Sequence, residues 1–105
     1  MTYILAITTV ATLDDAKQLG HILVQEKLCA CVNILSKCCS IYSWQGNIEE
    51  TEEHILLIKT LSDAYVNLEA KIQEIHKYDI PEIITIDITN GLPSYLNWFS
   101  LAMQN

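Results

Sequence analysis

The order of strand-type and helix-type hydrophobic patterns constrains this chain more than any other feature. Runs rich in β-branched and apolar residues, typical of strands, occupy residues 3–10, 29–44, 48–60 and 83–89. Apolar residues at helical spacing occupy residues 13–27, 63–75 and 95–103. This order, β-α-β-β-α-β with a terminal helix, predicts an α+β fold: a ferredoxin-like sandwich in which two helices cover one face of a four-stranded sheet.

Short signals in the sequence place the ends of these elements. Thr12 is the predicted N-cap of the first helix, and Ser62 is that of the second. The Gln-Gly-Asn triplet at residues 45–47 predicts a tight turn, because glycine readily adopts positive φ. Residues 36–37 interrupt the second strand and predict a bend or bulge there.

The two middle strands predict a hairpin longer than a small sheet requires. Residues 49–53 (EETEE) are polar toward both faces, so we expect them to stand out in water. Residues 55–58 (ILLI) are apolar toward both faces, and we expect them, like the first strand, to be buried on both. A half-polar hairpin that overhangs its own domain is suited to pairing with another subunit.

The charge of the chain narrows the range of partners. The 105 residues include 13 Asp and Glu against 6 Lys and no Arg, for a formal net charge of -7. DNA and RNA binders need clustered basic residues, so we expect no nucleic-acid partner. No apolar run approaches the ~20 residues of a membrane span, and the first residues lack the features of a signal peptide. We therefore expect a cytoplasmic protein.

Four cysteines, Cys29, Cys31, Cys38 and Cys39, fall close together. Without a secretion signal, we expect reduced thiols rather than disulfides. On a strand, the Cys-x-Cys pair would point both thiols to one face. Two interpretations stay open: a soft-metal site for Zn(II) or Cu(I), or small, partly buried hydrophobic side chains. The Cys-x₂-Cys spacing of structural zinc sites is absent, which favours the second interpretation.

Four separated motifs point to a known family. They are residues 30–34 with 40–46 (ACVNI and SIYSWQG), Glu53 with residues 57–60 (LIKT), residues 76–84 (HKYDIPEII), and Gly91 with residues 95–98 (YLNW). In order and in spacing they resemble the motifs of the CutA family, the divalent-cation tolerance proteins. The resemblance covers nearly the whole chain.

The resemblance implies a ferredoxin-like subunit of a tight homotrimer, in which strands of neighbouring subunits pair edge to edge. It also implies a role in tolerance of divalent cations, chiefly copper, and a proposed copper-binding property. Some bacterial members carry a Cys in the first strand and a second His before the 76–84 block, where this chain has Thr8 and Ile75. Of the three copper ligands proposed for such members, only His76 carries over, as the candidate ligand for Cu(II) or another divalent metal.

The same motifs supply the candidate binding residues of an inter-subunit cleft. They are Lys59, Tyr78, Glu82, Tyr42, Trp44 and Trp98, with His76 as the metal ligand. Such a cleft would take a metal ion or a small anionic ligand, with Lys59 as the anion-binding cation. Structural alternatives stay open: His76 caps its helix, Lys59 pairs with Glu82, and the aromatic residues anchor a subunit interface.

We therefore expect a homotrimeric CutA-like protein that takes part in the response to metal ions by binding rather than by turnover. The sequence holds no G-x-S-x-G, P-loop, dinucleotide-binding or His-Glu-x-x-His motif, so we expect no enzymatic activity. An active site assembled across subunits stays open. So do two other functions: a small-molecule-binding signalling trimer resembling the nitrogen-regulatory PII proteins, and a structural trimer that anchors a partner protein.

Overall fold

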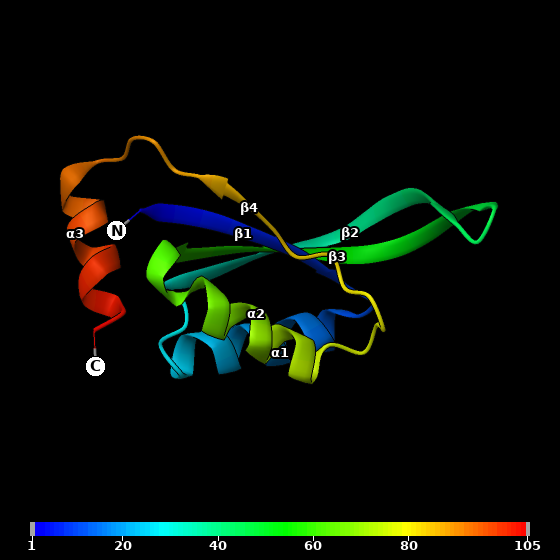
Figure 1. Cartoon of the computed structure of the whole chain (residues 1–105), viewed down its shortest axis with the longest axis horizontal. Helices are drawn as coiled ribbons and strands as arrows, with labels where there is room; N and C mark the ends of the chain where they lie inside the picture. The colour runs from blue at the N-terminus through cyan, green and yellow to red at the C-terminus, as the bar shows by residue number, and fades with distance from the viewer. Residues whose placement is uncertain (1, 105) are drawn as a thin grey trace.

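A four-stranded antiparallel sheet with two helices against one face forms the body of this computed structural model, which describes residues 2–104 (Figure 1). The strands are β1 (Tyr3–Val10), β2 (Cys31–Trp44), β3 (Asn47–Leu61) and β4 (Ile84–Asp87). The helices are α1 (Leu13–Gln25), α2 (Tyr65–Ile75) and α3 (Pro93–Ala102), with a single 3₁₀ turn, η1 (Ser62–Ala64), leading into α2.

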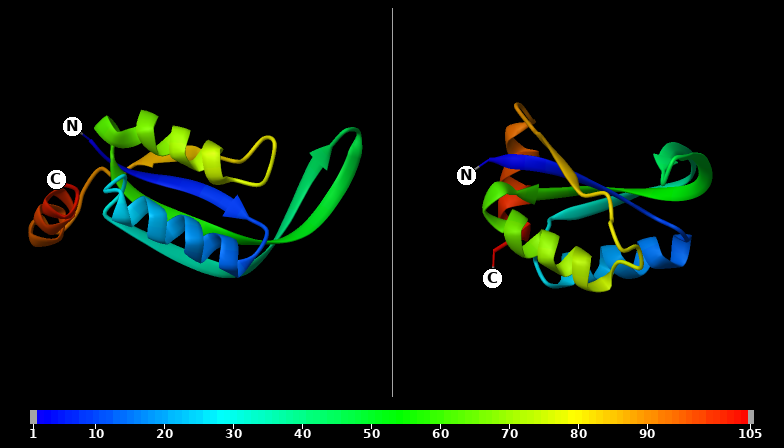
Figure 2. Two further views of the ribbon diagram at one scale, coloured as in Figure 1. Left: turned by 90° about the horizontal axis from the view of Figure 1, so that it is seen from below. Right: turned by 45° about the vertical axis from the view of Figure 1, so that its right-hand side comes forward.

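The strands lie in the order β2-β3-β1-β4, and each neighbouring pair is antiparallel. β1 and β2 are therefore parallel to each other with β3 between them, as in a split βαβ unit. This is the α+β arrangement that the order of the patterns predicted. α1 and α2 lie on the same side of the sheet, whereas α3 lies at the end of the molecule opposite the hairpin tip (Figure 1 and Figure 2).

The helix-covered face of the sheet carries the main core. Ala6 lies opposite Ile58 in the β1–β3 register, and Thr8 lies opposite Leu56, so alternate side chains of both strands point to the helices. Helical spacing aims one stripe of α1 and of α2 back at them. The buried helix residues of this core are Ala16, Leu19, Leu23, Leu68 and Ile72. A smaller core of Ala30, Leu61 and Phe99 holds α3 against the end of the sheet.

The other face of the sheet carries no helix, and we call it the open face. Strand register places seven large apolar residues on it: Leu5, Ile7, Leu35, Ile55, Leu57, Ile84 and Ile86. Leu35, Ile84 and Ile86 remain 51%, 52% and 54% exposed. On the central strands β1 and β3, Leu5, Ile7, Ile55 and Leu57 are only partly buried. The expectation that these strands are buried on both faces is therefore wrong for a single chain, because one chain supplies only one layer of helices.

Beyond the helices, β2 and β3 continue as a long hairpin that we call the arm, residues 38–53 (Figure 1). A register shift between Leu35 and Cys38, with Lys37 at φ 63°, forms the bulge predicted at residues 36–37. At the tip, Gln45 and Gly46 both have positive φ, as a type I′ turn requires. The predicted turn and bulge are confirmed.

The predicted polarity of the arm is confirmed along most of its length. Glu49, Glu50 and Glu52 are exposed, as expected for strands that no other layer covers. Glu53, at the root of the arm, is buried. Along β3, the side chain of Glu52 is therefore exposed and that of the next residue, Glu53, is buried.

Several predicted ends of elements differ from the structure, and those of β4 and α2 have a clear cause. β4 has four residues rather than 83–89, because its ladder with β1 ends where Asp87 pairs with Ile4 and only one further bond follows, from the Ile88 N–H to the Tyr3 carbonyl. Ser62 does not cap α2 through its side chain, because its hydroxyl accepts the Thr2 N–H and η1 leads into the helix. The Thr12 cap of α1 is confirmed, since its hydroxyl accepts the Asp15 N–H at 3.0 Å.

The expected pairing of the first two thiols on one face is also wrong. β2 begins only at Cys31, which lies opposite Lys59 on the open face. Cys29 precedes the strand and is buried in the helix-side core. None of the helices in residues 2–104 combines the length and hydrophobicity that a bilayer crossing requires.

Candidate functional site

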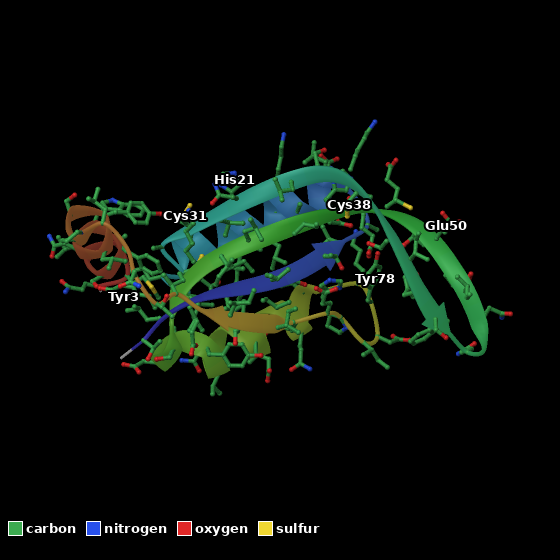
Figure 3. The ribbon with its side chains drawn as sticks, turned by 90° about the horizontal axis from the view of Figure 1, so that it is seen from above. Tyr3, His21, Cys31, Cys38, Glu50 and Tyr78 are labelled. Carbon is green, nitrogen blue, oxygen red and sulfur yellow. The ribbon has the colours of Figure 1, made fainter. Side chains whose placement is uncertain are left out.

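A groove of about 630 Å³ lies at the root of the arm. The end of β1, the arm and the segment that follows α2 supply its walls. The lining residues are Thr9, Ser40, Ile41, Tyr42, Trp44, Glu53, Tyr78, Asp79, Ile80 and Glu82. Figure 3 shows Tyr78 beside the point where the arm leaves the body. The groove combines three carboxylates with three aromatic rings, and no lysine or histidine lines it.

Four of the predicted binding residues meet in this groove. Tyr42 and Trp44 reach it from β2, and Tyr78 and Glu82 from the segment after α2. Ser40 was not predicted to take part. The sequence could have indicated Ser40, because side chains two positions apart on a strand point to the same face, as residues 40, 42 and 44 do on β2.

Glu53 and Tyr78 form the polar centre of the groove. The Tyr78 hydroxyl donates to Glu53 Oε2 at 2.9 Å. Glu53 is only 7% exposed. Burial, and then the hydrogen bond to Glu53, raise the pKa of the Tyr78 phenol to about 12. Tyr78 therefore stays a neutral donor across the physiological pH range.

His76 lies directly behind the groove and holds the segment that carries Tyr78. It follows the last residue of α2, and its backbone N–H donates to the Ile72 carbonyl. Its Nδ1 accepts the Tyr78 N–H at 3.1 Å, so the proton of the neutral ring sits on Nε2 and is donated to the Thr9 carbonyl at 2.7 Å. Both ring nitrogens are thus occupied, and the ring bonds β1 rather than the last carbonyls of its own helix.

Lys59 and Trp98 lie away from the groove of their own chain. The Lys59 Nζ donates to the Tyr95 hydroxyl at 3.3 Å and lies 5.5 Å from the centroid of that ring. Trp98 is the neighbour of Tyr95 on α3, with ring centroids 5.5 Å apart. α3 and the arm occupy opposite ends of the molecule (Figure 1). The alternative pairing of Lys59 with Glu82 is wrong, because none of the ion pairs within residues 2–104 joins them.

The described side chains, those of residues 2–104, do not build a metal site of three or more His, Cys, Asp or Glu ligands within one chain. Thr8 and Ile75, at two of the ligand positions implied by the resemblance, belong to or pack against the helix-side core. His76 has no free ring nitrogen. A metal site would need ligands from further subunits.

The four cysteines are free thiols, as expected. Cys29 precedes β2 and the other three lie within it, with Cys31 near one end of the body and Cys38 at the root of the arm (Figure 3). Burial raises the pKa of the Cys29 thiol to about 12. The thiols do not form a soft-metal cluster within residues 2–104.

Known proteins match both the sequence and the shape. The family model of the CutA1 divalent ion tolerance protein matches residues 4–102. The divalent-cation tolerance protein CutA of Thermus thermophilus is 40% identical over 90 residues, which cover 86% of this chain and 87% of that protein. The chloroplastic protein CutA of Arabidopsis thaliana is 37% identical over 97% of this chain, but the chain spans only 56% of that relative.

A solved structure matches the fold of this chain. The crystal structure of the divalent ion tolerance protein CutA1 from Ehrlichia chaffeensis is 38% identical and superposes with a TM-score of 0.93. The match covers 99% of this chain and 97% of that one. The family model and the relatives together extend across the sheet, the arm and all three helices. The chain belongs to the CutA1 divalent ion tolerance family.

Proposed function

We propose that this chain is one subunit of a homotrimer that contributes to tolerance of divalent cations by binding, without turnover. The open face carries the proposal. Its large apolar side chains come from all four strands, and the three on the edge strands β2 and β4 remain about half exposed. A contiguous apolar surface of this kind is typical of a protein–protein interface.

The edges of the sheet support the same conclusion. β2 and β4 are the edge strands, and neither is covered by a helix or a loop along its outer side (Figure 2). Edge strands expose unpaired N–H and C=O groups that pair readily with another chain. The arm adds Ile41 and Ile48, which are 65% and 80% exposed on a hairpin with no core of its own.

Static light scattering on open-face variants tests the proposal. Wild-type protein is expected to have the mass of three chains, and Leu35→Glu combined with Ile86→Glu is expected to give single chains, because buried unpaired carboxylates are costly. Val66→Glu is the matched control, since Val66 is an exposed apolar residue on α2, away from the open face. A wild-type mass of one chain, or three chains in all variants, would overturn the proposed assembly.

Within the assembly, we propose the groove as the binding site. Its support is the meeting of Tyr42, Trp44, Tyr78 and Glu82 in one cavity. The described side chains of a single chain do not provide a copper site, and we propose no copper binding by them. We propose the cytoplasm as the compartment, and the four free thiols support a reducing location.

A further inference from the structure

We propose that the groove at the root of the arm binds a small organic ammonium ion. The inference rests on the proposed function, because it takes the groove as the binding site and names the class of its ligand. The net charge of the chain alone does not carry it. The argument comes from one buried carboxylate and from the side chains around it.

Glu53 is the observation that points to a cation. It lines the groove with a 7% exposed side chain, and the partner of its carboxylate among residues 2–104 is the neutral phenol of Tyr78, at Oε2. The ion pairs of the described chain use Lys71 and Lys77, and neither of them pairs with Glu53. A buried carboxylate without a compensating cation is costly, so a positively charged ligand gains by pairing with it.

The other side chains that line the groove also favour a cation over an anion. Asp79 and Glu82 add two exposed carboxylates, and the described residues that line the groove include no lysine or histidine to compensate an anion's charge. The expectation of a small anionic ligand is therefore not supported at the groove. Lys59, the cation predicted for an anionic ligand, donates to Tyr95 and lies away from the groove of its own chain.

The aromatic side chains favour an organic cation over a metal ion. A hard divalent ion needs several oxygen ligands converging on one point, and no such group exists within the described residues. An ammonium ion needs only one close carboxylate and an aromatic face within about 6 Å. Tyr42, Trp44 and Tyr78, which are all partly exposed, provide such faces and also cover the hydrocarbon part of a ligand. The groove has the size of a small-molecule site.

Three ligands that share a four-carbon chain distinguish the effect of ligand charge on binding from the effect of ligand shape. They are putrescine, a dication; 1,4-butanediol, its neutral analogue; and succinate, a dianion. The chain has two tryptophans, so a Trp98→Phe background leaves Trp44, inside the groove, as the sole tryptophan, which is excited selectively at a wavelength where tyrosine does not absorb. Putrescine at micromolar to millimolar concentration is expected to change the Trp44 emission saturably, while butanediol and succinate leave it unchanged.

Two matched double variants localise the effect. Asp79→Asn with Glu82→Gln removes two groove carboxylates and is expected to weaken putrescine binding about tenfold, the loss of two exposed ion pairs. Glu49→Gln with Glu50→Gln removes the same charge from the arm outside the groove and is expected to leave binding unchanged. Glu53→Gln is expected to abolish binding, and the exposed pair keeps the test valid if this variant does not fold.

The outcomes are decisive. No saturable response to putrescine, an equal response to succinate, or equal weakening by both double variants overturns the inference. An equal response to Mg²⁺ alone also overturns it, because the groove would then be a site for inorganic cations. Light scattering on the same samples separates the two proposals: a monomer that binds putrescine contradicts the assembly alone, and a trimer without a response contradicts this inference alone.

Discussion

The body and the arm are built from the same two strands but are stabilised in different ways. In the body, Leu56 and Ile58 of β3 are fully buried beneath the helices. In the arm beyond its root, no other element of residues 2–104 covers either face, and Ile48 of the same strand is 80% exposed. A two-stranded hairpin alone is only marginally stable in water. The difference supports the proposal that the arm contacts another chain, because its own chain supplies no core for it.

The reactivity of the thiols gives the largest expected difference between the two regions. Cys29 lies in the body, where burial raises its pKa to about 12, and Cys39 is exposed on the arm. A rise from the ordinary value lowers the thiolate fraction of Cys29 roughly a thousandfold. Timed iodoacetamide labelling with mass spectrometry is expected to modify Cys39 first and Cys29 last. Urea-unfolded protein should label both alike. Early labelling of native Cys29 would contradict the buried placement.

Truncation of core and arm residues gives the next largest contrast. Leu56→Ala removes a fully buried side chain and is expected to lower the free energy of unfolding by about 2–5 kcal/mol. Ile48→Ala removes an exposed one and is expected to change it by less than about 0.5 kcal/mol in the dissociated chain. Urea unfolding of both variants in the Leu35→Glu, Ile86→Glu background measures these values. Equal losses would mean that the arm has a core of its own.

The sequence predicted most of the body because each element there follows one dominant signal. The predicted bounds of the first strand coincide with those of β1. Its alternating burial and its pairing with β3 extend over the same residues. The turn at Gly46 and the bulge at Lys37 were also predictable, because positive φ leaves a clear mark in the sequence. β4 was predicted too long because its apolar run faces the open side, where nothing in one chain ends the pattern.

The candidate site was predictable only in part. Residues 40–44 reach the groove through strand alternation, and Tyr78 and Glu82 follow close behind the end of α2. His76 was expected as a ligand, yet its ring bonds β1 and the backbone of Tyr78. The bond from the Tyr78 N–H is local, but nothing local in the sequence indicates the tertiary hydrogen bond to the Thr9 carbonyl. Lys59 was placed in the cleft by motif alone, and its contact with Tyr95 depends on where α3 packs.

The pair at the centre of the groove gives a smaller expected effect. Tyr78→Phe removes the donor to buried Glu53 and is expected to cost about 1–3 kcal/mol, whereas Tyr42→Phe, in the same groove, is expected to cost far less. Because the pKa of Tyr78 is raised to about 12, its contribution is present below the ordinary tyrosine pKa near 10 and is lost as the pH rises toward 12. Urea unfolding at neutral and alkaline pH measures both effects. Equal costs of the two substitutions at neutral pH would contradict the role of the bond.

The smallest expected effect concerns the anchor of the segment behind the groove. Lys77 Nζ lies 2.9 Å from Asp15 Oδ1, and this hydrogen bond lowers the pKa of the Asp15 carboxyl. The stabilisation is present above the ordinary Asp pKa and is lost as the pH falls below it. Lys77→Ala is expected to cost no more than about 1 kcal/mol at neutral pH and almost nothing in acid. Lys17→Ala, on the exposed side of α1, is the control. A cost that does not change with pH would exclude the ion pair as its cause.

Amide hydrogen exchange tests most directly whether the arm and the open face are contact surfaces. Exchange is compared, peptide by peptide, between wild-type protein and the Leu35→Glu, Ile86→Glu variant. We predict slower exchange in the wild type across residues 38–53 and 84–87, with little difference in the helix-covered residues 13–25. Equal exchange in the arm and in β4 of both proteins would contradict the proposal that these surfaces bind another copy of the chain.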